Sequence, residues 1–434
     1  MLDRRRFFLP GLAMAAMFIG IGWYASQSTT DSEAPASVLR APPGSLDISA
    51  PVWPVAPGDA ALKIDVDTPP EKQLARVFDE IEANRLGNAL QLTESLLQKH
   101  PNYRLAHLIR GDLLLARTQP IPAFGAANEA PERVADLRAE AMARLLAYRE
   151  KPPTDFIPRY LLQMRADQKH ALIVDTRRSR LYVYENDNEG AGQPRFVTDY
   201  YISQGKLGAE KASEGDKKTP IGVYHVTASL PRQKLADLYG NGAFPLNYPN
   251  EWDKRNGRGG SGIWLHGTQS DTFSRPPLAS DGCVVLTNPD LEAIAKTLQI
   301  GLTPVIISDS MEWIAPAEWN QERDALNQAV DAWRKDWESR DTDKYLTHYS
   351  RRFKTPEQDY ARFASQKRQV NSGKTHIEVK ISNLTLFRNP GKDDVVVATF
   401  DQDYRSNNLN NQMRKRQYWI REDGQWKIAY EGAA

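Results

Sequence analysis

The spacing of apolar residues divides the chain into helical and strand-like stretches. In the first third of the chain, helical spacing is carried by Leu74, Val77, Phe78 and Ile81. Gly87 breaks this pattern, and further helical stretches follow over residues 89–97, 103–116 and 132–150. We therefore predict an α-helical segment over residues 71–150, which begins with a helical hairpin.

The start of this helical segment resembles one tetratricopeptide repeat unit. The resemblance rests on Leu86-Gly87-Asn88-Ala89-Leu90 and on His100-Pro101-Asn102-Tyr103. A single unit is too small for a free-standing array, because each repeat buries its apolar face against a neighbour. We therefore favour a helical prop packed on the next domain over a module that binds an envelope protein as partner.

The middle of the chain has the apolar pattern of short strands. Two apolar runs, at 171–175 and 180–184, are separated by polar residues and predict a β-hairpin. Further strands are predicted over 196–203, 221–227 and 303–307. This pattern indicates a mainly-β domain with loops at one end, where catalytic groups usually lie.

Residues 317–434 form a separate unit in the sequence. The stretch from Trp319 to Trp337 is amphipathic and predicts a long helix. Alternating strands follow at residues 377–381, 395–399 and 418–420. Asp423-Gly424 is typical of a tight hairpin turn. Helices followed by antiparallel strands indicate an α+β domain, and we interpret its tryptophans as core residues.

The N-terminus has the pattern of an export signal. Arg4-Arg5-Arg6 precedes an apolar run from Phe7 to Tyr24, which is about long enough to span a bilayer. We predict that residues 1–25 are a signal peptide or a membrane anchor, and the absence of a clear cleavage site favours the anchor. Residues 26–70 are rich in Pro, Ser and Ala and read as a disordered linker. The basic cluster places the remaining chain in the periplasm or cell envelope.

Composition excludes several classes of function. The 56 basic and 55 acidic residues give a net charge of +1, so no overall field recruits nucleic acid. The sequence has no zinc-protease motif, no paired-cysteine motif and no phosphate-binding loop, so we expect neither a metal nor another cofactor. Nothing in the sequence sets an oligomeric state.

Cys283 is the only cysteine in the chain, and it follows Gly282 in a predicted tight turn. His266 lies at the end of a separate predicted strand. A thiolate is the reactive form of cysteine, and a nearby imidazole can generate it, so the pair suits a nucleophile and its base. The alternative is an inert buried thiol, which is the usual role of a lone cysteine.

Three motifs in this region resemble the catalytic domain of the L,D-transpeptidase (YkuD-type) family. They are His266-Gly267-Thr268, Ser280-Asp281-Gly282-Cys283 and Lys218-Thr219-Pro220-Ile221-Gly222-Val223-Tyr224. The resemblance covers residues 169–308 and implies a β-sandwich-like fold. It implies that Cys283 is the nucleophile, His266 the general base, and Gly267 the residue whose carbonyl orients the histidine. It also implies that the N–H groups of Gly282 and Cys283 form an oxyanion hole.

The resemblance further implies a reaction on peptidoglycan stem peptides. The thiolate would cleave the bond between diaminopimelate and D-alanine, and the thioester would pass to an amine or to water. Ser280, Asp281, Thr268 and Arg275 are the expected substrate-binding residues. Asp281 stands where many relatives have histidine, and Val285 where they often have Asn or Arg. An ionised Asp281 would raise the thiol pKa unless a cation such as Arg275 pairs with it.

Residues 317–434 resemble the nuclear transport factor 2-like fold, a conical α+β barrel. Together with a transpeptidase-type domain, this organisation is similar to that of L,D-carboxypeptidases that set cell shape. Three alternatives therefore stay open beside transpeptidation: a carboxypeptidase only, an amidase that releases peptidoglycan-tethered protein, and a non-catalytic envelope scaffold.

Overall fold

The computed structural model describes residues 68–121, 123–126, 134–187, 192–391 and 393–434. The predicted signal or anchor at 1–25, and nearly all of the predicted linker at 26–70, lie outside these residues. Within the described ranges, no helix is both long and apolar enough to cross a membrane.

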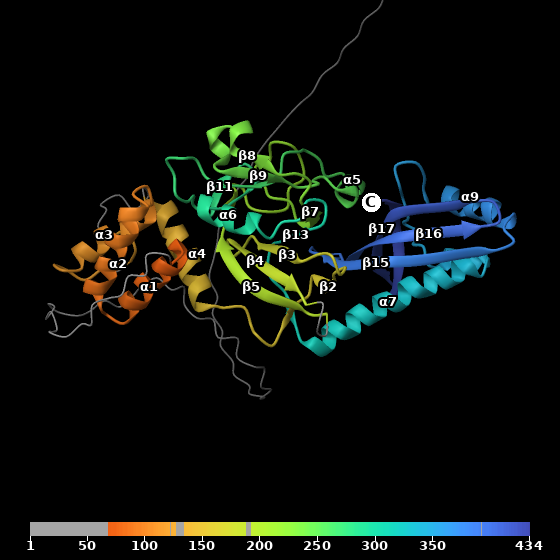
Figure 1. Ribbon diagram of the computed structural model, residues 1–434, viewed down its shortest axis with the longest axis horizontal. Helices are drawn as coiled ribbons and strands as arrows, with labels where there is room; N and C mark the ends of the chain where they lie inside the picture. The colour runs from red at the N-terminus through yellow and green to blue at the C-terminus, as the bar shows by residue number, and fades with distance from the viewer. Residues whose placement is uncertain (1–67, 122, 127–133, 188–191, 392) are drawn as a thin grey trace, which may run out of the picture. The chain divides into compact units, whose positions relative to one another are not determined.

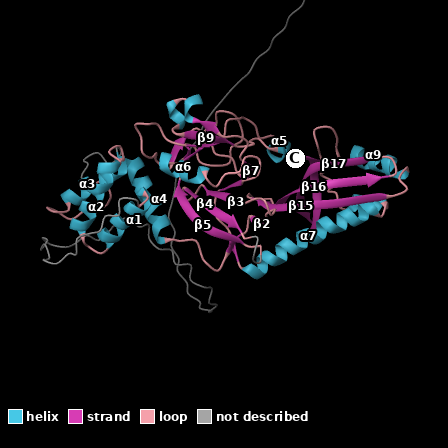
Figure 2. Cartoon of the chain, in the orientation of Figure 1, coloured by secondary structure: helices cyan, strands magenta, loops and turns pink. Residues whose placement is uncertain are grey.

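The first described part of the chain is helical, as Figures 1 and 2 show. Its helices are α1 (Pro70–Glu82), α2 (Leu86–Lys99), α3 (Arg104–Leu115) and α4 (Ala135–Arg149). The expectation that Gly87 breaks the pattern is wrong, because Gly87 lies inside α2. The break falls at Asn84, whose φ of 57° is left-handed and incompatible with a continuing helix.

The helical segment has an apolar core of its own. Leu74, Phe78, Leu96 and Ile109 are among the buried residues that α1, α2 and α3 contribute to it, and Leu145 of α4 joins them. The sequence predicts a tetratricopeptide-like helical hairpin in this segment. The helices are present, and the repeat identity stays a prediction.

The middle of the chain forms two main sheets around a shared core. The larger sheet has the order β5-β4-β3-β13-β7. Its strands are β3 (His170–Asp175), β4 (Arg180–Asn186), β5 (Pro194–Tyr201), β7 (Gly222–His225) and β13 (Pro304–Ser308). The predicted hairpin is confirmed, because β3 and β4 pair antiparallel. Both faces of β3 are buried, which explains why its sequence is a continuous apolar run rather than an alternating one.

The smaller sheet has the order β12-β10-β9-β8. Its strands are β8 (Leu230–Pro231), β9 (Gly242–Pro245), β10 (Trp264–His266) and β12 (Val284–Val285). Leu265 and Val284 share one buried cluster with Leu172 and Val305 of the larger sheet, so the two sheets form a sandwich. Beside this core lie β6 (Gln204–Gly205), which pairs with β11 (Leu278–Ser280), the short helix α5 (Glu251–Arg255) and α6 (Asn288–Ala295).

The C-terminal part is a long helix against an antiparallel sheet. Helix α7 (Pro316–Glu338) is followed by α8 (Thr342–Thr347), α9 (Tyr360–Ser372), β15 (Ile377–Asn389), β16 (Val395–Ser406), β17 (Asn410–Glu422) and β18 (Gln425–Ala433). The predicted turn at Asp423-Gly424 is confirmed, with positive φ at both residues. Trp333 and Trp419 are fully buried in the core, as expected.

One strand of the C-terminal sheet comes from far earlier in the chain. Strand β2 (Leu161–Gln163) pairs antiparallel with β15, so the sheet order is β18-β17-β16-β15-β2 (Figure 1). Nearby, β1 (Ile157–Pro158) pairs with β14 (Trp313–Ile314). The segment between the helices and the sandwich therefore contributes a strand to the C-terminal domain.

A buried ion pair inside this domain gives a stability prediction. Lys415 lies 3.0 Å from Glu431, and both side chains are at least nine-tenths buried. Burial alone would raise the pKa of Glu431, but Lys415 and Lys367 hold it at about 2. We expect Glu431→Gln to lower the free energy of unfolding by about 3 kcal/mol at neutral pH, because it leaves buried cations uncompensated.

The expected loss depends on pH. Because the pKa of Glu431 is lowered from 4.5, its contribution is present above pH 4.5 and disappears as the pH falls towards 2. Urea denaturation followed by tryptophan fluorescence measures it. The exposed pair between Lys380 and Glu378 supplies the control, since Glu378→Gln should cost at most about 1 kcal/mol. Equal losses in the two variants would contradict the prediction.

Candidate active site

The register of two strands places Cys283 and His266 on one face of the smaller sheet. Strand β10 pairs parallel with β12, with Leu265 opposite Val284 and His266 opposite Val285. The next position back sets Cys283 opposite Trp264. Leu265 and Val284 point into the sandwich core, so their neighbours Cys283 and His266 point to the other face.

The turn before the thiol requires glycine. Gly282 has a φ of 129°, and a Cβ there would lie 2.7 Å from the carbonyl oxygen of Lys218. The hydroxyl of Thr219 donates to the Gly282 carbonyl at 3.0 Å and accepts from the N–H of Gly205 at 2.9 Å. Ser280 closes the turn, because its hydroxyl donates to the Cys283 carbonyl at 2.6 Å and accepts from the Gly282 N–H at 3.1 Å.

The thiol of Cys283 is protonated at neutral pH. Its residue is partly exposed, yet the surrounding protein desolvates the sulfur and raises the thiol pKa. The N–H of Trp264 and the charge of Arg275 act in the opposite direction. The thiol donates to the Gly262 carbonyl at 3.3 Å. A thiol in this state needs a base at the moment of attack.

His266 is held as a neutral imidazole with one nitrogen available. Its Nδ1 lies 2.7 Å from the carbonyl oxygen of Gly267. A carbonyl only accepts, so Nδ1 carries the proton and Nε2 keeps its lone pair. Burial lowers the pKa of His266 to about 4, against the raising effect of the Gly267 contact. The ring of Tyr239 packs against the imidazole with centroids 5.1 Å apart.

Asn288 fixes the backbone that orients the histidine. Its amide accepts from the Asn241 N–H at 3.0 Å and donates to the Thr268 carbonyl at 2.9 Å. The same side-chain oxygen fills the space that a Cβ at Gly267 would need, which explains a glycine after the histidine. Sequence reasoning missed Asn288, although it directly follows Thr287, whose hydroxyl caps α6.

The expected substrate residues lie around this pair in different ways. Asp281 is 72% exposed and pairs with Lys206 at 3.2 Å, so its expected partner Arg275 is replaced by a lysine. The Arg275 guanidinium donates to the Leu238 carbonyl at 3.0 Å and to Gln269 at 3.2 Å.

Two further positions of the motifs are buried. Thr268 is buried and donates to the Phe273 carbonyl at 3.3 Å. Val285 is 2% exposed, so a solvent-borne acceptor reaches little of its side chain.

The Gly282 geometry gives a second prediction. We expect Gly282→Ala to reduce turnover by about 100-fold or more, because the new Cβ displaces the Lys218 carbonyl and moves the thiol from its position. Gly259→Ala is the matched control, since a Cβ there meets nothing within 4 Å. D-alanine release from a tetrapeptide stem measures both variants. Near wild-type activity of Gly282→Ala would contradict the prediction.

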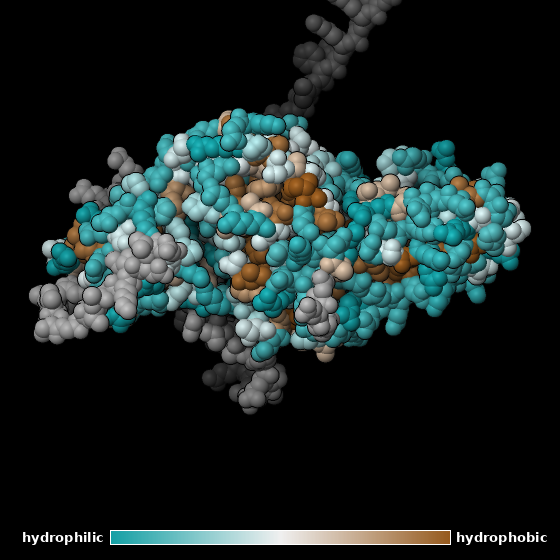
Figure 3. Space-filling model, in the orientation of Figure 1, coloured by the Kyte–Doolittle hydropathy of each residue, from teal (hydrophilic) through white to brown (hydrophobic). Residues whose placement is uncertain are grey.

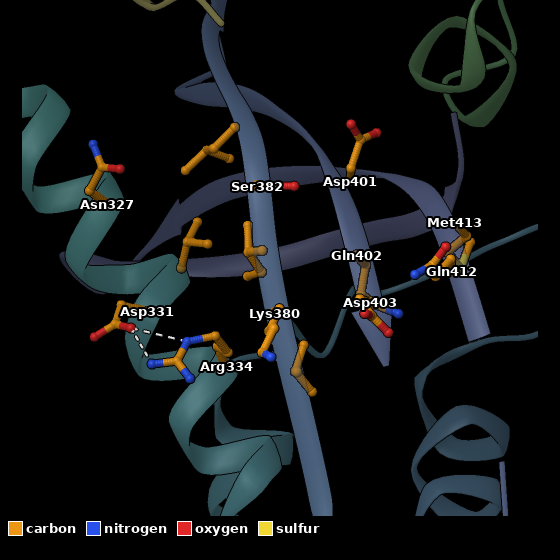
Figure 4. Close-up of a pocket in the computed structure, with 14 residues that line it drawn as sticks. Asn327, Asp331, Arg334, Lys380, Ser382, Asp401, Gln402, Asp403, Gln412 and Met413 are labelled. Atoms are coloured by element: carbon orange, nitrogen blue, oxygen red, sulfur yellow. Dashed lines mark hydrogen bonds and ion pairs between the residues drawn. The ribbon is translucent and has the colours of Figure 1, made fainter. Parts of the chain in front are cut away.

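A second concave region lies in the C-terminal domain. A groove of about 1060 Å³ runs between α7 and strands β15 to β17, and Figure 4 shows its polar side chains. Each charged residue that lines it has an ion-pair partner; these residues are Asp331, Arg334, Lys380, Asp401 and Asp403. In the described ranges no cluster of His, Cys, Asp or Glu could hold a metal ion.

The surface in the view of Figure 3 is polar over most of its area, with apolar residues gathered over the region of β7 and β9. Large apolar side chains are exposed at Leu207, Leu238 and Leu278. Leu238 is also the residue whose carbonyl binds Arg275.

Comparison with known proteins identifies two domains. Residues 169–307 match the L,D-transpeptidase catalytic domain (YkuD), and residues 325–432 match the Cds6 C-terminal NTF2-like domain. The structure of Bdellovibrio bacteriovorus Bd1075 is 31% identical, covers 64% of this chain and 98% of its own, and gives a TM-score of 0.57. The chain belongs to the L,D-transpeptidase (YkuD) family. The resemblance found in the sequence motifs is thereby confirmed.

A second similar structure is that of the helical cell shape determining protein Pgp2 from Campylobacter jejuni. It is 27% identical, covers 64% of this chain and 95% of its own, and has a TM-score of 0.56. No curated protein matches the chain. The family acts on peptidoglycan stem peptides, which makes a peptidoglycan-active function the general conclusion for this member.

Proposed function

We propose that the chain is a cysteine enzyme that cleaves the diaminopimelate–D-alanine bond of peptidoglycan stem peptides through a thioester on Cys283. The observation that carries the proposal is the state of His266. Its Nδ1 donates a hydrogen bond to the Gly267 carbonyl, which leaves Nε2 unprotonated. The imidazole lies on the same sheet face as Cys283. A neutral imidazole and a protonated thiol on the same sheet face are the two groups that general-base activation requires.

The residues support a two-stage reaction. The sulfur of Cys283 attacks the carbonyl carbon of diaminopimelate while Nε2 of His266 takes the thiol proton. Collapse of the tetrahedral intermediate breaks the C–N bond, and the imidazolium gives its proton to the departing D-alanine amine. The thioester then passes its acyl group to water, which yields a tripeptide, or to an amine of another stem, which yields a cross-link.

The developing oxyanion needs donors close to the thiol. We assign this role to the N–H groups of Gly282 and Cys283, which lie in the turn that Gly282 permits. The N–H of Gly282 already donates to the Ser280 hydroxyl at 3.1 Å, so it would be shared between that hydroxyl and the oxyanion. Ser280 thus acts through the shape of the turn.

Arg275 is the proposed contact for a substrate carboxylate. Its charge reaches Cys283, and stem peptides end in carboxylates that a guanidinium binds well. Thr268 shapes the same loop. Asp281 points to solvent and pairs with Lys206, yet its charge still contributes to raising the pKa of the Cys283 thiol. These features favour neither water nor an amine as acceptor.

The wider setting rests on the same family. We propose that the enzyme works in the cell envelope and, by analogy with the named Pgp2 protein, in setting cell shape. The boundaries 71–150, 169–308 and 317–434 stay predictions, as do the N-terminal anchor and an envelope protein partner.

A digest of disaccharide-tetrapeptide with the full chain, followed by mass spectrometry, tests the proposal. Loss of D-alanine with a monomeric tripeptide product would identify a carboxypeptidase. A dimer joined through two diaminopimelate residues would identify a transpeptidase. No change of substrate would contradict the proposal and favour an amidase or a scaffold.

A further inference from the structure

The loop between the two proposed catalytic residues is attached to the helical segment. It leaves β10 after His266 and reaches β11 shortly before Cys283. Three consecutive residues, Phe273, Ser274 and Arg275, are each tied to the helices directly or through one intermediate side chain. The last of them, Arg275, carries a charge that lowers the pKa of the Cys283 thiol.

Phe273 lies in the apolar core of the helical segment. Its side chain is 7% exposed and belongs to the cluster that α1 to α4 form. Its ring centroid is 4.2 Å from that of Tyr103 and 4.7 Å from that of His100. A catalytic-domain loop thus inserts an aromatic anchor into the helical core, and burial of such a ring contributes a large part of a contact's stability.

A network of polar contacts also attaches the loop to the helical segment. The Ser274 hydroxyl donates to Glu140 at 2.7 Å, and Glu140 pairs with Arg144 at 2.9 Å. The Arg144 guanidinium stacks on the ring of Tyr201 at 3.9 Å. Tyr201 in turn donates its hydroxyl to the Arg275 carbonyl at 2.9 Å. The backbone of the loop is therefore held from α4 and from β5.

The same network of polar contacts includes buried ion pairs. Arg144 also pairs with Glu71 of α1, and Glu71 pairs with Arg180 of β4 at 2.9 Å. Arg144 and Arg180 are almost completely buried, so each needs its carboxylate partners in place. Such an interface fixes one geometry, because a small displacement leaves a buried charge unpaired.

We propose that the helical segment is a positioning element of the proposed catalytic site: it holds the loop 268–275, which follows His266 and Gly267 in the chain and carries Arg275. Phe273 is the principal positioning residue. The expected change in KM rests on the proposed function, whereas the expected change in the thiol pKa of Cys283 does not. Neither matched family domain reaches this segment, since the catalytic match begins at residue 169. The helical segment therefore affects the proposed reaction through the position of this loop.

Substitution of Phe273 in the full chain tests the proposal. We expect Phe273→Ala to raise the KM for disaccharide-tetrapeptide by about tenfold, with a smaller change in kcat, because Arg275 is no longer held for the substrate carboxylate. Phe273→Leu keeps an apolar anchor and should restore most of the affinity. Phe78→Ala is the control, since Phe78 packs on Phe124 within the helical core. Thermal melts report whether each variant is folded.

The second readout does not depend on turnover. Arg275 lowers the pKa of the Cys283 thiol, so the pH midpoint of iodoacetamide alkylation should move upward in Phe273→Ala. Simple opening of the loop would raise the alkylation rate at every pH without moving the midpoint. Ser274→Ala removes only the hydroxyl contact with Glu140 and should shift the midpoint in the same direction by less.

The two readouts separate the two hypotheses. If the wild type releases no D-alanine, the proposed function fails, and the alkylation midpoint alone decides the role of the helices. A folded Phe273→Ala protein with the wild-type midpoint, and with the wild-type KM where there is turnover, overturns the inference. So does a midpoint shift of equal size in Phe78→Ala, because the effect would then come from general loosening of the helical core.

Discussion

Replacing Cys283 with alanine is expected to reduce D-alanine release from tetrapeptide stems by about 10⁴-fold or more, because no other group can form the acyl-enzyme. Cys283 is the only cysteine in the sequence, so no second thiol can take over. Its side chain is partly exposed at the end of a turn, so the substitution removes little packing. The variant should therefore fold as the wild type does.

The measurement is a time course of D-alanine release, with a thermal melt of each protein. Cys283→Ser serves as a second variant that keeps the shape and hydrogen bonding of the side chain while replacing the thiol with a poorer nucleophile. A Cys283→Ala protein that retains even one per cent of wild-type turnover would place the chemistry elsewhere.

Replacing His266 with alanine is expected to reduce kcat/KM by about 10²- to 10⁴-fold, because the protonated thiol of Cys283 then lacks its base. The effect should be specific to His266. Tyr239 packs on the imidazole but has no hydrogen bond to it, so Tyr239→Phe, which keeps the ring contact, should stay close to wild type.

The pH profile of kcat/KM tests the state of the base. Burial lowers the pKa of His266 from 6.5 to about 4, so the imidazole is neutral throughout the range above pH 5. The wild-type profile should stay flat from about pH 8 to about pH 5 and fall only as the pH approaches 4, where the base becomes protonated. The acid limb should disappear in His266→Ala. An inflection near pH 6.5 would show that the imidazole is not desolvated.

The candidate site residues could be predicted from the sequence, whereas most of the contacts that hold them in place could not. Cys283, His266 and Gly282 could be proposed from the sequence because the proposed chemistry needs a thiol, an imidazole and a turn with positive φ at defined positions. The strands of the sandwich were visible because both faces of β3 are buried and leave a continuous apolar run. Local patterns of this kind follow directly from the period of the backbone.

Contacts between distant segments could not be read in the same way. Strand β2 has three residues and joins a sheet whose other strands begin at residue 377, so no local pattern marks it. Phe273 is a single aromatic residue in a polar loop, and only the folded chain brings it to Tyr103. Lys206 could not be recognised as the partner of Asp281 for the same reason, because the pairing of β6 with β11 brings the two residues together.

The structure adds a specific contact to the prediction that the helical segment supports the next domain. The sequence favours a prop over a partner-binding module, because one repeat unit cannot bury its own apolar surface. In the structure the segment has a core of its own, and that core also holds the Phe273 anchor. An envelope partner of this segment stays a prediction.

The most direct test of the account is a search for the thioester itself. The full chain is mixed with disaccharide-tetrapeptide, quenched in acid within the first turnover, and digested with pepsin for mass spectrometry. We expect the peptide that contains Cys283 to carry the mass of the stem without its terminal D-alanine, and this adduct to be absent in Cys283→Ala. Release of D-alanine by the wild type with no acyl group on Cys283 at any quench time would contradict the central claim.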